Sequence, residues 1–288
     1  MKNKHVKIPV ALLFIILLSH ESFAQCSDAG VCQLGSQSVN VEKGTSLDVS
    51  VSYKFGSSGK DDDVKFHSLQ LNGSYGLLEN SSIQFLIPYN FQSGPAGNVN
   101  GVGDLILSWN QKLLSDENSS LSASIGAKLA TGSDNKNSLL QVYQSGLGSN
   151  DLLFTLSYSY KNINLGAGYQ LAGERNDNKL RLKRGDDFLL RGEYQFSFGE
   201  IKILPQLLFI KRLSKSSIID FNSPTEKFIE VDKSNQAQLN LLTALQYDFG
   251  GVYSLIGEFA IPFLKREVNV DGLTRVLSAL VGVRFSIN

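Results

Sequence analysis

The sequence predicts an all-β protein, a closed antiparallel transmembrane β-barrel of about twelve strands. Three observations lead to this fold class. Segments of about ten residues carry apolar side chains at every second position. The connections between these segments alternate between short and long, and the chain begins with an export signal. The composition of 42% hydrophobic and 19% charged residues, with 26 Gly and 6 Pro, suits a β-rich chain with many turns.

The export signal occupies residues 1–24. Lys2, Lys4 and Lys7 precede an unbroken apolar run from Val10 to Leu18, and small residues flank Phe23 just before Gln25. This is the layout of a cleaved secretory signal peptide. The apolar run is too short for an anchor helix, which needs roughly 20 residues. We therefore expect a mature chain with a periplasmic segment at 25–45 and a barrel at 46–288.

The strand segments follow one another from residue 46 to the end of the chain. In the first of them, Leu47, Val49, Val51, Tyr53 and Phe55 share one face and polar residues share the other. The predicted strands are Ser46–Phe55, Leu69–Leu77, Ile83–Phe91, Leu105–Trp109, Leu121–Leu129, Leu152–Tyr160, Ile163–Leu171, Phe188–Phe198, Ile201–Phe209, Leu239–Phe249, Tyr253–Ile261 and Leu277–Ile287.

The connections between the strands favour a membrane barrel over a soluble sandwich. Outer-membrane barrels have short turns at the periplasmic end and long loops at the outer end. The predicted short turns are Leu78–Ser81, Leu114–Ser119, Lys161–Asn162, Gly199–Glu200 and Gly250–Gly251. The predicted long loops are Gly56–Phe66, Gln92–Val102, Thr131–Asn150, Ala172–Gly185, Ser214–Ser234 and Leu264–Thr274. This strict order places both ends of the barrel on the periplasmic side.

The apolar faces have the length and the aromatic ends that a lipid environment requires. A tilted spanning strand needs about 9 to 11 residues, and all backbone polar groups must pair within the sheet. Tyr, Phe and Trp residues gather near the strand ends, as in interfacial girdles. A soluble barrel would turn the same faces inward, so strand number, loop order and the signal peptide together predict the bacterial outer membrane as the location.

Charge and functional side chains exclude several classes of function. Lys plus Arg and Asp plus Glu both total 27, so no basic surplus supports nucleic-acid binding. His67 is the only histidine beyond the signal peptide, and its neighbour Ser68 lies on the opposite strand face. We therefore expect neither an enzyme nor a cofactor. Asp61, Asp62 and Asp63 have the ligand type of a weak cation site, but such runs are usually solvated loops, so no metal site is predicted.

Several short motifs resemble a known family of outer-membrane proteins. They are Tyr75-Gly76-Leu77, Ser82-Ile83-Gln84-Phe85, Ile87-Pro88-Tyr89, Gly101-Val102-Gly103-Asp104-Leu105 and Lys128-Leu129-Ala130-Thr131-Gly132. This pattern resembles the outer-membrane transporter family named for the meta-pathway of phenol degradation. The resemblance covers Ser46–Leu171 well and implies an outer-membrane channel, without implying a phenolic solute. The segment from Gln25 to Cys32 and the non-aromatic end at Asn288 depart from the family pattern.

Two cysteines follow the signal peptide. Cys26 and Cys32 enter an oxidising compartment, where a small-loop disulfide is the leading interpretation. Lipidation of Cys26 is the alternative, although Gln25 is not the small residue that a lipid-attachment site prefers.

The polar strand faces are predicted to line the lumen. Their charged members are mixed in sign, which argues against strong ion selectivity. These lumen-facing candidates are Asp48, Lys54, Lys112, Lys128, Arg191, Glu193, Asp248, Glu258 and Arg284. About eight strands give a filled barrel and sixteen an open one, so twelve predict a narrow or gated lumen.

Two long loops have apolar residues that need a place to pack, namely Thr131–Asn150 and Ser214–Ser234. Each is expected either to extend the barrel wall as a hairpin or to fold inward as a lid. The predicted function is passive or weakly selective passage of small solutes. The alternatives are a plugged barrel that carries hydrophobic compounds, with Gln25–Thr45 in the lumen, and an adhesive barrel that binds a partner through its loops. The expected partners are small-molecule solutes, outer-membrane lipid and the barrel-assembly machinery.

Overall fold

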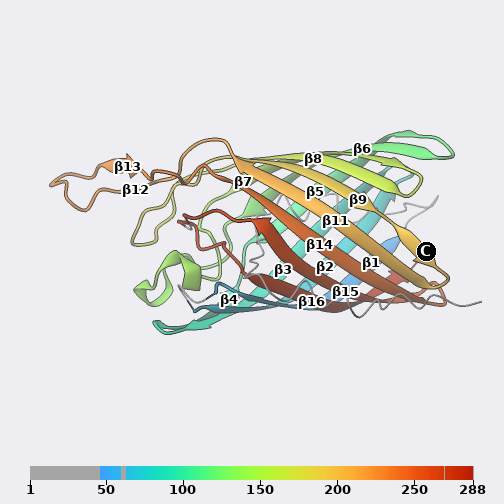
Figure 1. Ribbon diagram of the computed structural model, residues 1–288, viewed down its shortest axis with the longest axis horizontal. Coiled ribbons are helices and arrows are strands. Elements are labelled where there is room, and N and C mark those ends of the chain that lie inside the picture. The colour runs from blue at the N-terminus through green and yellow to red at the C-terminus, as the bar shows by residue number, and fades with distance from the viewer. Residues whose placement is uncertain (1–45, 60–62, 269, 288) are drawn as a thin grey trace, which may run out of the picture.

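The computed structural model describes residues 46–59, 63–268 and 270–287 and shows a closed antiparallel β-barrel (Figure 1). Twelve wall strands make up the barrel in this part of the chain. The strand bounds are β1 Leu47–Ser57, β2 Lys65–Leu78, β3 Ser81–Gly94, β4 Gly97–Val102, β5 Leu105–Ser115, β6 Ser119–Leu129, β7 Asp151–Tyr160, β8 Ile163–Leu171, β9 Asp187–Tyr194, β10 Phe196–Phe198, β11 Ile201–Arg212, β12 Ser217–Ile219, β13 Phe228–Glu230, β14 Ala237–Phe249, β15 Tyr253–Leu264 and β16 Leu277–Ile287. The predicted fold class and strand number are confirmed.

Two of the wall strands are interrupted. β4 and β5 pair in turn with β3 and form one wall strand with a break at Gly103 and Asp104. β9 and β10 likewise pair with β11 on either side of Gln195. β1 closes the barrel by pairing with β16 along its whole length, from Leu47 opposite Ile287 to Ser57 opposite Leu277.

The two faces of the wall have opposite chemistry because successive strand side chains alternate. On β1, Val51 and Tyr53 are exposed on the outer face, whereas Ser50 and Ser52 are buried inside. Aromatic pairs mark the ends of the outer face, such as Tyr247 with Phe249 near the short turns. An apolar outer band with aromatic margins is the surface that a bilayer requires. Within the described residues, no helix is long and apolar enough to cross a membrane.

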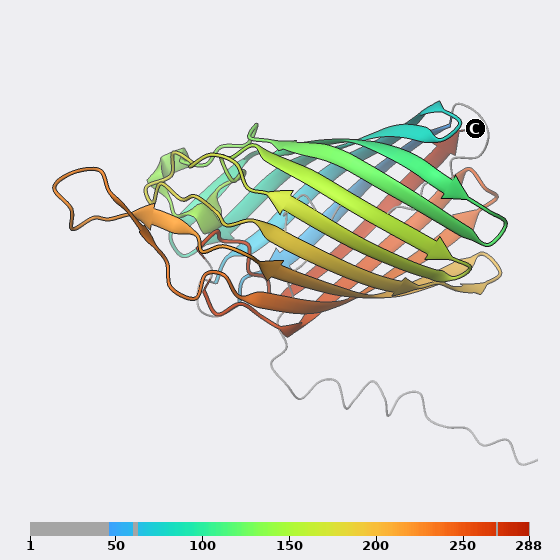
Figure 2. The same cartoon turned by 90° about the horizontal axis from the view of Figure 1, so that it is seen from above.

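The short turns and the long loops lie at opposite ends of the barrel, as the sequence predicts (Figures 1 and 2). The turns at the short end are tight, and Gly199 and Gly250 adopt φ of 60° and 62°, a backbone region that favours glycine. Both ends of the barrel sheet, at Leu47 and Ile287, lie at this short-turn end.

One predicted loop is wrong. Gln92–Val102 was expected to be a polar loop, but β3 continues to Gly94 and pairs with β4 from Gly97 to Val102. This hairpin rises beyond the apolar band, so its outward residues, such as Asn98 and Asn100, are polar. The hydrophobic alternation that reveals spanning strands is therefore absent there, although the backbone pairing continues.

The two long loops differ in their arrangement. Residues 130–150, here called the plug loop, contain short 3-10 helices at Lys136–Ser138 and Gln141–Tyr143 and fold inward at the barrel mouth. The loop that follows β11 instead forms the β12–β13 hairpin, which projects away from the barrel (Figure 2). The plug loop therefore folds inward as a lid, whereas the loop after β11 extends outward as a hairpin.

Candidate functional site

The inside of the barrel is the candidate functional site, and it has a layered structure. From the loop end inward, the plug loop is followed by buried charged residues and then by apolar side chains. A polar chamber follows these and lies towards the short turns. The layers arise because inward-facing residues on neighbouring strands stand at the same height in a registered sheet.

The plug loop is packed into the mouth by apolar contacts. Val142 and Tyr143 are buried in a cluster with three wall residues, Val64, Phe66 and Val99. Burial of such side chains stabilises a packed state by about 1.5–3 kcal/mol each. The apolar members of this loop, noted in the sequence as needing a partner, find it inside the barrel mouth.

Asp104 anchors both ends of the plug loop. Its carboxylate accepts hydrogen bonds from the backbone N–H of Gly132 at 3.2 Å and of Leu147 at 2.8 Å. Thr131 Oγ1 donates to the carbonyl of Gly103 at 2.8 Å and accepts from the N–H of Leu105. The two loop ends therefore meet at the break between β4 and β5.

A close backbone approach at this anchor requires glycine. A Cβ atom on Gly132 would lie 2.7 Å from the Cα of Gly146, which is closer than real Cβ contacts come. The motifs Gly103-Asp104 and Thr131-Gly132, which are distant in the sequence, thus form one structural unit at the base of the plug loop.

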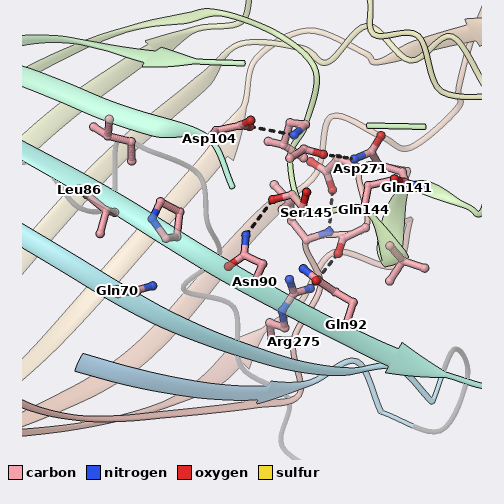
Figure 3. Close-up of a pocket in the computed structure, with 17 residues that line it drawn as sticks. Gln70, Leu86, Asn90, Gln92, Asp104, Gln141, Gln144, Ser145, Asp271 and Arg275 are labelled. Atoms are coloured by element: carbon pink, nitrogen blue, oxygen red, sulfur yellow. Dashed lines mark hydrogen bonds between the residues drawn. The ribbon is translucent and has the colours of Figure 1, made fainter. Parts of the chain in front are cut away.

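Three other elements hold the loop from the side. Asn90 on β3 donates to the carbonyl of Ser145 at 2.7 Å (Figure 3). Asn176, from the loop after β8, donates to Gln141 Oε1 at 2.7 Å. Gly272, from the loop after β15, lies so close that a Cβ atom there would be 2.5 Å from the Cα of Val142.

The space left between the plug loop and the wall is small. Gln70, Asn90 and Gln92 of the wall and Gln144 of the loop line an enclosed cavity of about 40 Å³ (Figure 3). One water molecule needs roughly 10–15 Å³ on this measure. The cavity therefore has room for a few water molecules and none for an organic solute.

A layer of buried charges lies below the plug loop. We call it the ionic layer, and its members are Asp104, Lys128, Asp151, Arg184, Asp187, Arg212, Arg266 and Asp271. Lys128 Nζ lies 2.7 Å from Asp151, and Arg184 bridges Asp151 and Asp187 at 3.1 and 3.0 Å. Arg212 joins Asp187 at 3.0 Å to Asp271 at 2.8 Å. Positive and negative members balance in number.

The ionic layer connects the wall to the loops. Lys128 and Asp151 face each other across β6 and β7, and Asp187 and Arg212 face each other across β9 and β11. Asp271 reaches this layer from the loop after β15, in which Gly272 touches the plug loop. Removal of one partner from a buried pair costs about 3–5 kcal/mol, so these loops are firmly fixed.

The charge on Asp271 is strongly stabilised. Burial alone would raise the pKa of this carboxyl, but the guanidinium groups of Arg212, Arg266 and Arg184 outweigh burial and hold the pKa well below its usual range. A depressed folded-state pKa contributes stability that is fully present above the ordinary carboxyl value of about 4 and is lost only as the pH falls below it.

We predict that the contacts of Asp271 do not respond to mild acid, because its carboxyl stays charged between pH 5 and pH 7.5. Burial raises the pKa of Asp104, the carboxyl that holds the ends of the plug loop, so the test uses the variant Asp104→Asn. In this variant the protection of residues 131–150 against hydrogen exchange should stay constant across the window, and the additional change Asp271→Asn should lower it at every pH, since Arg212 loses a charged partner. A steep loss of protection in Asp104→Asn between pH 7 and pH 5 would contradict this account.

An apolar layer fills the barrel below the ionic layer. Its inward-facing members are Leu86, Ile106, Leu153, Leu189, Leu208, Ile210, Leu242 and Ala260. Leu153 and Leu208 are 0% exposed, so side chains of the wall itself occupy the lumen at this height. Such a layer excludes hydrated ions, because they would lose their water shells.

The chamber nearest the short turns is polar and open. It has a volume of about 430 Å³ and is lined by Ser, Asn and Gln residues of β3 to β9, together with Lys112, Arg191 and Glu193. Glu193 accepts hydrogen bonds from Asn164 at 2.8 Å and from Gln206 at 3.1 Å. The chamber is large enough for a small solute, since ligand pockets span about 300–1,000 Å³.

The nine lumen-facing candidates fall in different places. Lys128 lies in the ionic layer, and Lys112, Arg191 and Glu193 line the chamber. Asp248 bonds Lys202 at 2.9 Å, Asp48 accepts from the Ser286 hydroxyl, and Lys54 is buried near the loop end. Glu258 and Arg284 stand at half-buried positions on β15 and β16. Cys26 and Cys32 lie outside the described residues.

Sequence reasoning missed the two layers that close the lumen. Of the ionic layer it selected Lys128 alone, although Asp104 was visible in the Gly-x-Gly-Asp motif. The inward leucines had a signal as well. Leu152-Leu153-Phe154 and Leu207-Leu208-Phe209 are continuous apolar runs, and a strand with such a run is apolar on both faces.

The groups considered for chemistry do not assemble into a reactive site. The Tyr53 hydroxyl and His67 Nδ1 are hydrogen-bonded on the outer face, whereas Ser68 is buried inside. In the part of the chain that the structure describes, no cluster of three or more His, Cys, Asp or Glu residues is suited to a metal ion.

Comparisons with known proteins identify the fold. No family model matches the sequence, and no curated protein matches it either. Among solved structures, an outer membrane channel from Pseudomonas putida F1 superposes with a TM-score of 0.65 at 16% identity, covering 85% of this chain and 96% of that one. The NanC porin superposes with a TM-score of 0.50 at 16% identity, covering 83% and 98%. The chain therefore has the fold of outer-membrane β-barrel channels and porins.

Proposed function

We propose that the protein is a gated channel for small solutes in a bacterial outer membrane. One observation carries this proposal: an apolar-walled barrel encloses a polar chamber of about 430 Å³ beneath a plug loop that hydrogen bonds and apolar packing hold in the mouth. A barrel with a purely structural role has no need for a hydrated chamber under a separately anchored loop. The described conformation is the closed state of the channel.

The channel opens, in this account, by two changes in series. The plug loop has to leave the mouth, which breaks its hydrogen bonds to Asp104 and Asn90, and the side chains of the apolar layer have to part. Polar solutes and ions then pass without a strong preference for charge, because the ionic layer contains balanced charges.

Planar-bilayer recording tests this function. Purified protein should give rare but discrete conductance steps, with long closed periods between them. A matched preparation in which the barrel is unfolded by heat should be silent. Complete silence of the folded wild-type protein at all voltages would contradict the channel function.

The fold supports the further proposal that the chain is a distant member of the transporter family that its motifs resemble. The motif residues Gly103, Asp104, Thr131 and Gly132 lie together at the base of the plug loop, which gives the motif one structural role. A chimera that carries the equivalent loop of a family member in place of residues 131–150 should fold and keep the loop anchored. A chimera that fails to fold, while a glycine–serine replacement of equal length folds, would argue against membership.

Export and membrane insertion complete the proposal. We infer cleavage before Gln25, a periplasmic segment at 25–45 with a Cys26–Cys32 disulfide, and insertion by the barrel-assembly machinery into outer-membrane lipid. The apolar outer face supports the lipid environment. Mass spectrometry of the mature protein should give an amino terminus at Gln25 and a mass two hydrogens below the dithiol form. A lipidated Cys26 or a detergent-free soluble protein would contradict it.

The projecting hairpin favours a second function at the loop end. β12 and β13 extend beyond the barrel mouth (Figure 1), and Phe221 at 70% exposure lies between them. An exposed aromatic residue on a projecting hairpin suits contact with a partner. Deletion of residues 217–230 should then abolish binding of a partner to the loop end of the barrel and leave conductance unchanged. Loss of conductance with unchanged binding would exclude the adhesive role.

A further inference from the structure

We propose that the polar chamber is a binding site for a small neutral polyhydroxylated solute, such as a sugar, that enters from the short-turn end. This inference rests on the proposed channel function and adds the chemical class of the solute. It is carried by the lining of the chamber, by buried polar atoms between the chamber and the apolar layer, and by the absence of aromatic rings among the described residues that line it.

Hydroxyl groups form a regular array on the chamber wall. On the inner face of β6 and β7, Ser120 stands opposite Ser159, and Ser122 stands opposite Ser157. All four residues line the chamber. Hydroxyl groups both donate and accept hydrogen bonds and rotate to suit a partner. An array of them matches a ligand that also presents several hydroxyl groups at similar spacing.

The inner wall between the apolar layer and the chamber-lining residues Asn110 and Ser124 contains polar atoms without a protein partner. Ser108 and Thr155 are 4% and 9% exposed, and their hydroxyl oxygens make no hydrogen bond within the described part of the chain. The amide nitrogen of Asn110 is also unpaired there, while its oxygen accepts from the Ser124 hydroxyl. Ser124 pairs across the sheet with Asn110 on one side and Thr155 on the other.

These atoms are placed to receive a ligand rather than to hold the wall together. A buried polar atom without a partner costs about 1–3 kcal/mol, and this cost is removed when a ligand supplies the hydrogen bond. Ser108 lies one inward position from Ile106, and Thr155 lies one inward position from Leu153, so both stand at the boundary with the apolar layer. A solute that rises through the chamber meets them immediately before the constriction.

The charges of the chamber favour a neutral ligand. The carboxylate of Glu193 is bonded by the amides of Asn164 and Gln206, and Arg191 is 8% exposed in the wall and has interactions of its own. Lys112 and Lys161 are balanced by the acidic residues Asp116 and Glu117 in the lining of the same chamber, and the ammonium group of Lys161 lies over the ring of Tyr160. A carboxylate or phosphate ligand would need a convergent cluster of free cations, and the lining does not offer one.

The lining also disfavours aromatic solutes. Among the described residues that surround the chamber, none is Phe, Tyr or Trp, whereas the outer wall is rich in them. An aromatic solute would gain no ring contact and would displace water from hydroxyl and amide groups that it does not satisfy. The chamber therefore favours solutes that form many hydrogen bonds.

A measurement of equilibrium binding tests this site without requiring the solute to pass through the barrel. The ligand is sucrose, and saturation-transfer NMR on the full mature protein in nanodiscs reports contact between sucrose and the protein. Phenol and inorganic phosphate are added as competitors. Sucrose should receive magnetisation, and neither phenol nor phosphate should displace it. Preferential binding of phenol or phosphate, or no contact with sucrose, would overturn the assignment.

Variants locate the site. Thr155→Val combined with Ser122→Ala and Ser157→Ala removes three hydroxyl groups with small changes of shape and should weaken sucrose binding about tenfold or more. The matched control, Ser68→Ala with Ser278→Ala, alters inward serines near the loop end and should leave binding unchanged. Equal effects of both sets would place sucrose elsewhere and overturn the site. Folding of each variant is checked by heat-shifted electrophoretic mobility.

The binding measurement and the conductance measurement test the two proposals separately. Binding of sucrose by a protein that never conducts would support the site and refute the channel. Conductance without sucrose binding would refute the site and leave the channel intact.

Discussion

Replacement of Leu153 and Leu208 by serine is expected to increase ion conductance sharply. Both side chains are 0% exposed and fill the lumen at the height of the apolar layer. Each leucine contributes about 1.5–3 kcal/mol of apolar burial, so shorter, hydroxylated side chains should admit water and raise the time-averaged current about tenfold or more. Single-channel recording measures the change.

The matched control for this prediction uses the neighbouring residues on the same strands. Leu152 and Leu207 point outward and are 47% and 49% exposed, so Leu152→Ser with Leu207→Ser changes the same residue type on the lipid face. Conductance should stay at the wild-type level in this control. An equal rise in both pairs would show that general loosening of the barrel, and not the apolar layer, controls the current.

The variant Asp104→Ala is expected to release the plug loop. It removes the acceptor for the backbone N–H groups of Gly132 and Leu147 and takes one carboxylate from beside Lys128. Hydrogen bonds to charged groups contribute roughly 1.5–3 kcal/mol each, so loss of two of them should raise the open-to-closed ratio by about two to four orders of magnitude. Hydrogen exchange of residues 131–150 and open probability should increase together.

Two further variants serve as controls for Asp104→Ala. Asp104→Asn keeps one acceptor oxygen and should lie between wild type and Asp104→Ala. Asp116→Ala removes a carboxylate that bonds Ser119 at the opposite end of the barrel and should behave as wild type. Unchanged exchange of the plug loop in Asp104→Ala would show that apolar packing of Val142 and Tyr143 alone retains the loop.

The wall of the barrel was predictable because lipid imposes a simple rule on it. Val51 and Tyr53 face the bilayer while Ser50 and Ser52 face the lumen, and this contrast is written directly into the sequence. Where the strand leaves the bilayer the contrast ends. The alternation therefore predicts a loop at the β3–β4 hairpin, although the backbone of Tyr89–Gly94 pairs with that of Gly97–Val102.

The interior was only partly predictable because its layers depend on loop packing. Arg212 bonds Asp271 across 59 positions of sequence, and neither local propensity nor alternation indicates such a contact. The inward direction of residues 130–150 was open for the same reason, since Val142 and Tyr143 can pack inside the mouth or against another hairpin. Leu153 lies between Leu152 and Phe154, which by themselves account for the apolar outer face of the strand. The alternation therefore gave no sign that the inward residue is apolar as well.

Single-channel recording of the combined variant Asp104→Ala, Leu153→Ser and Leu208→Ser tests the central claim that two barriers in series close the lumen. The account predicts frequent, long-lived open steps in this variant, with more current than either the loop variant or the leucine pair passes. Wild-type protein that already conducts with steps of the same size and frequency would contradict it.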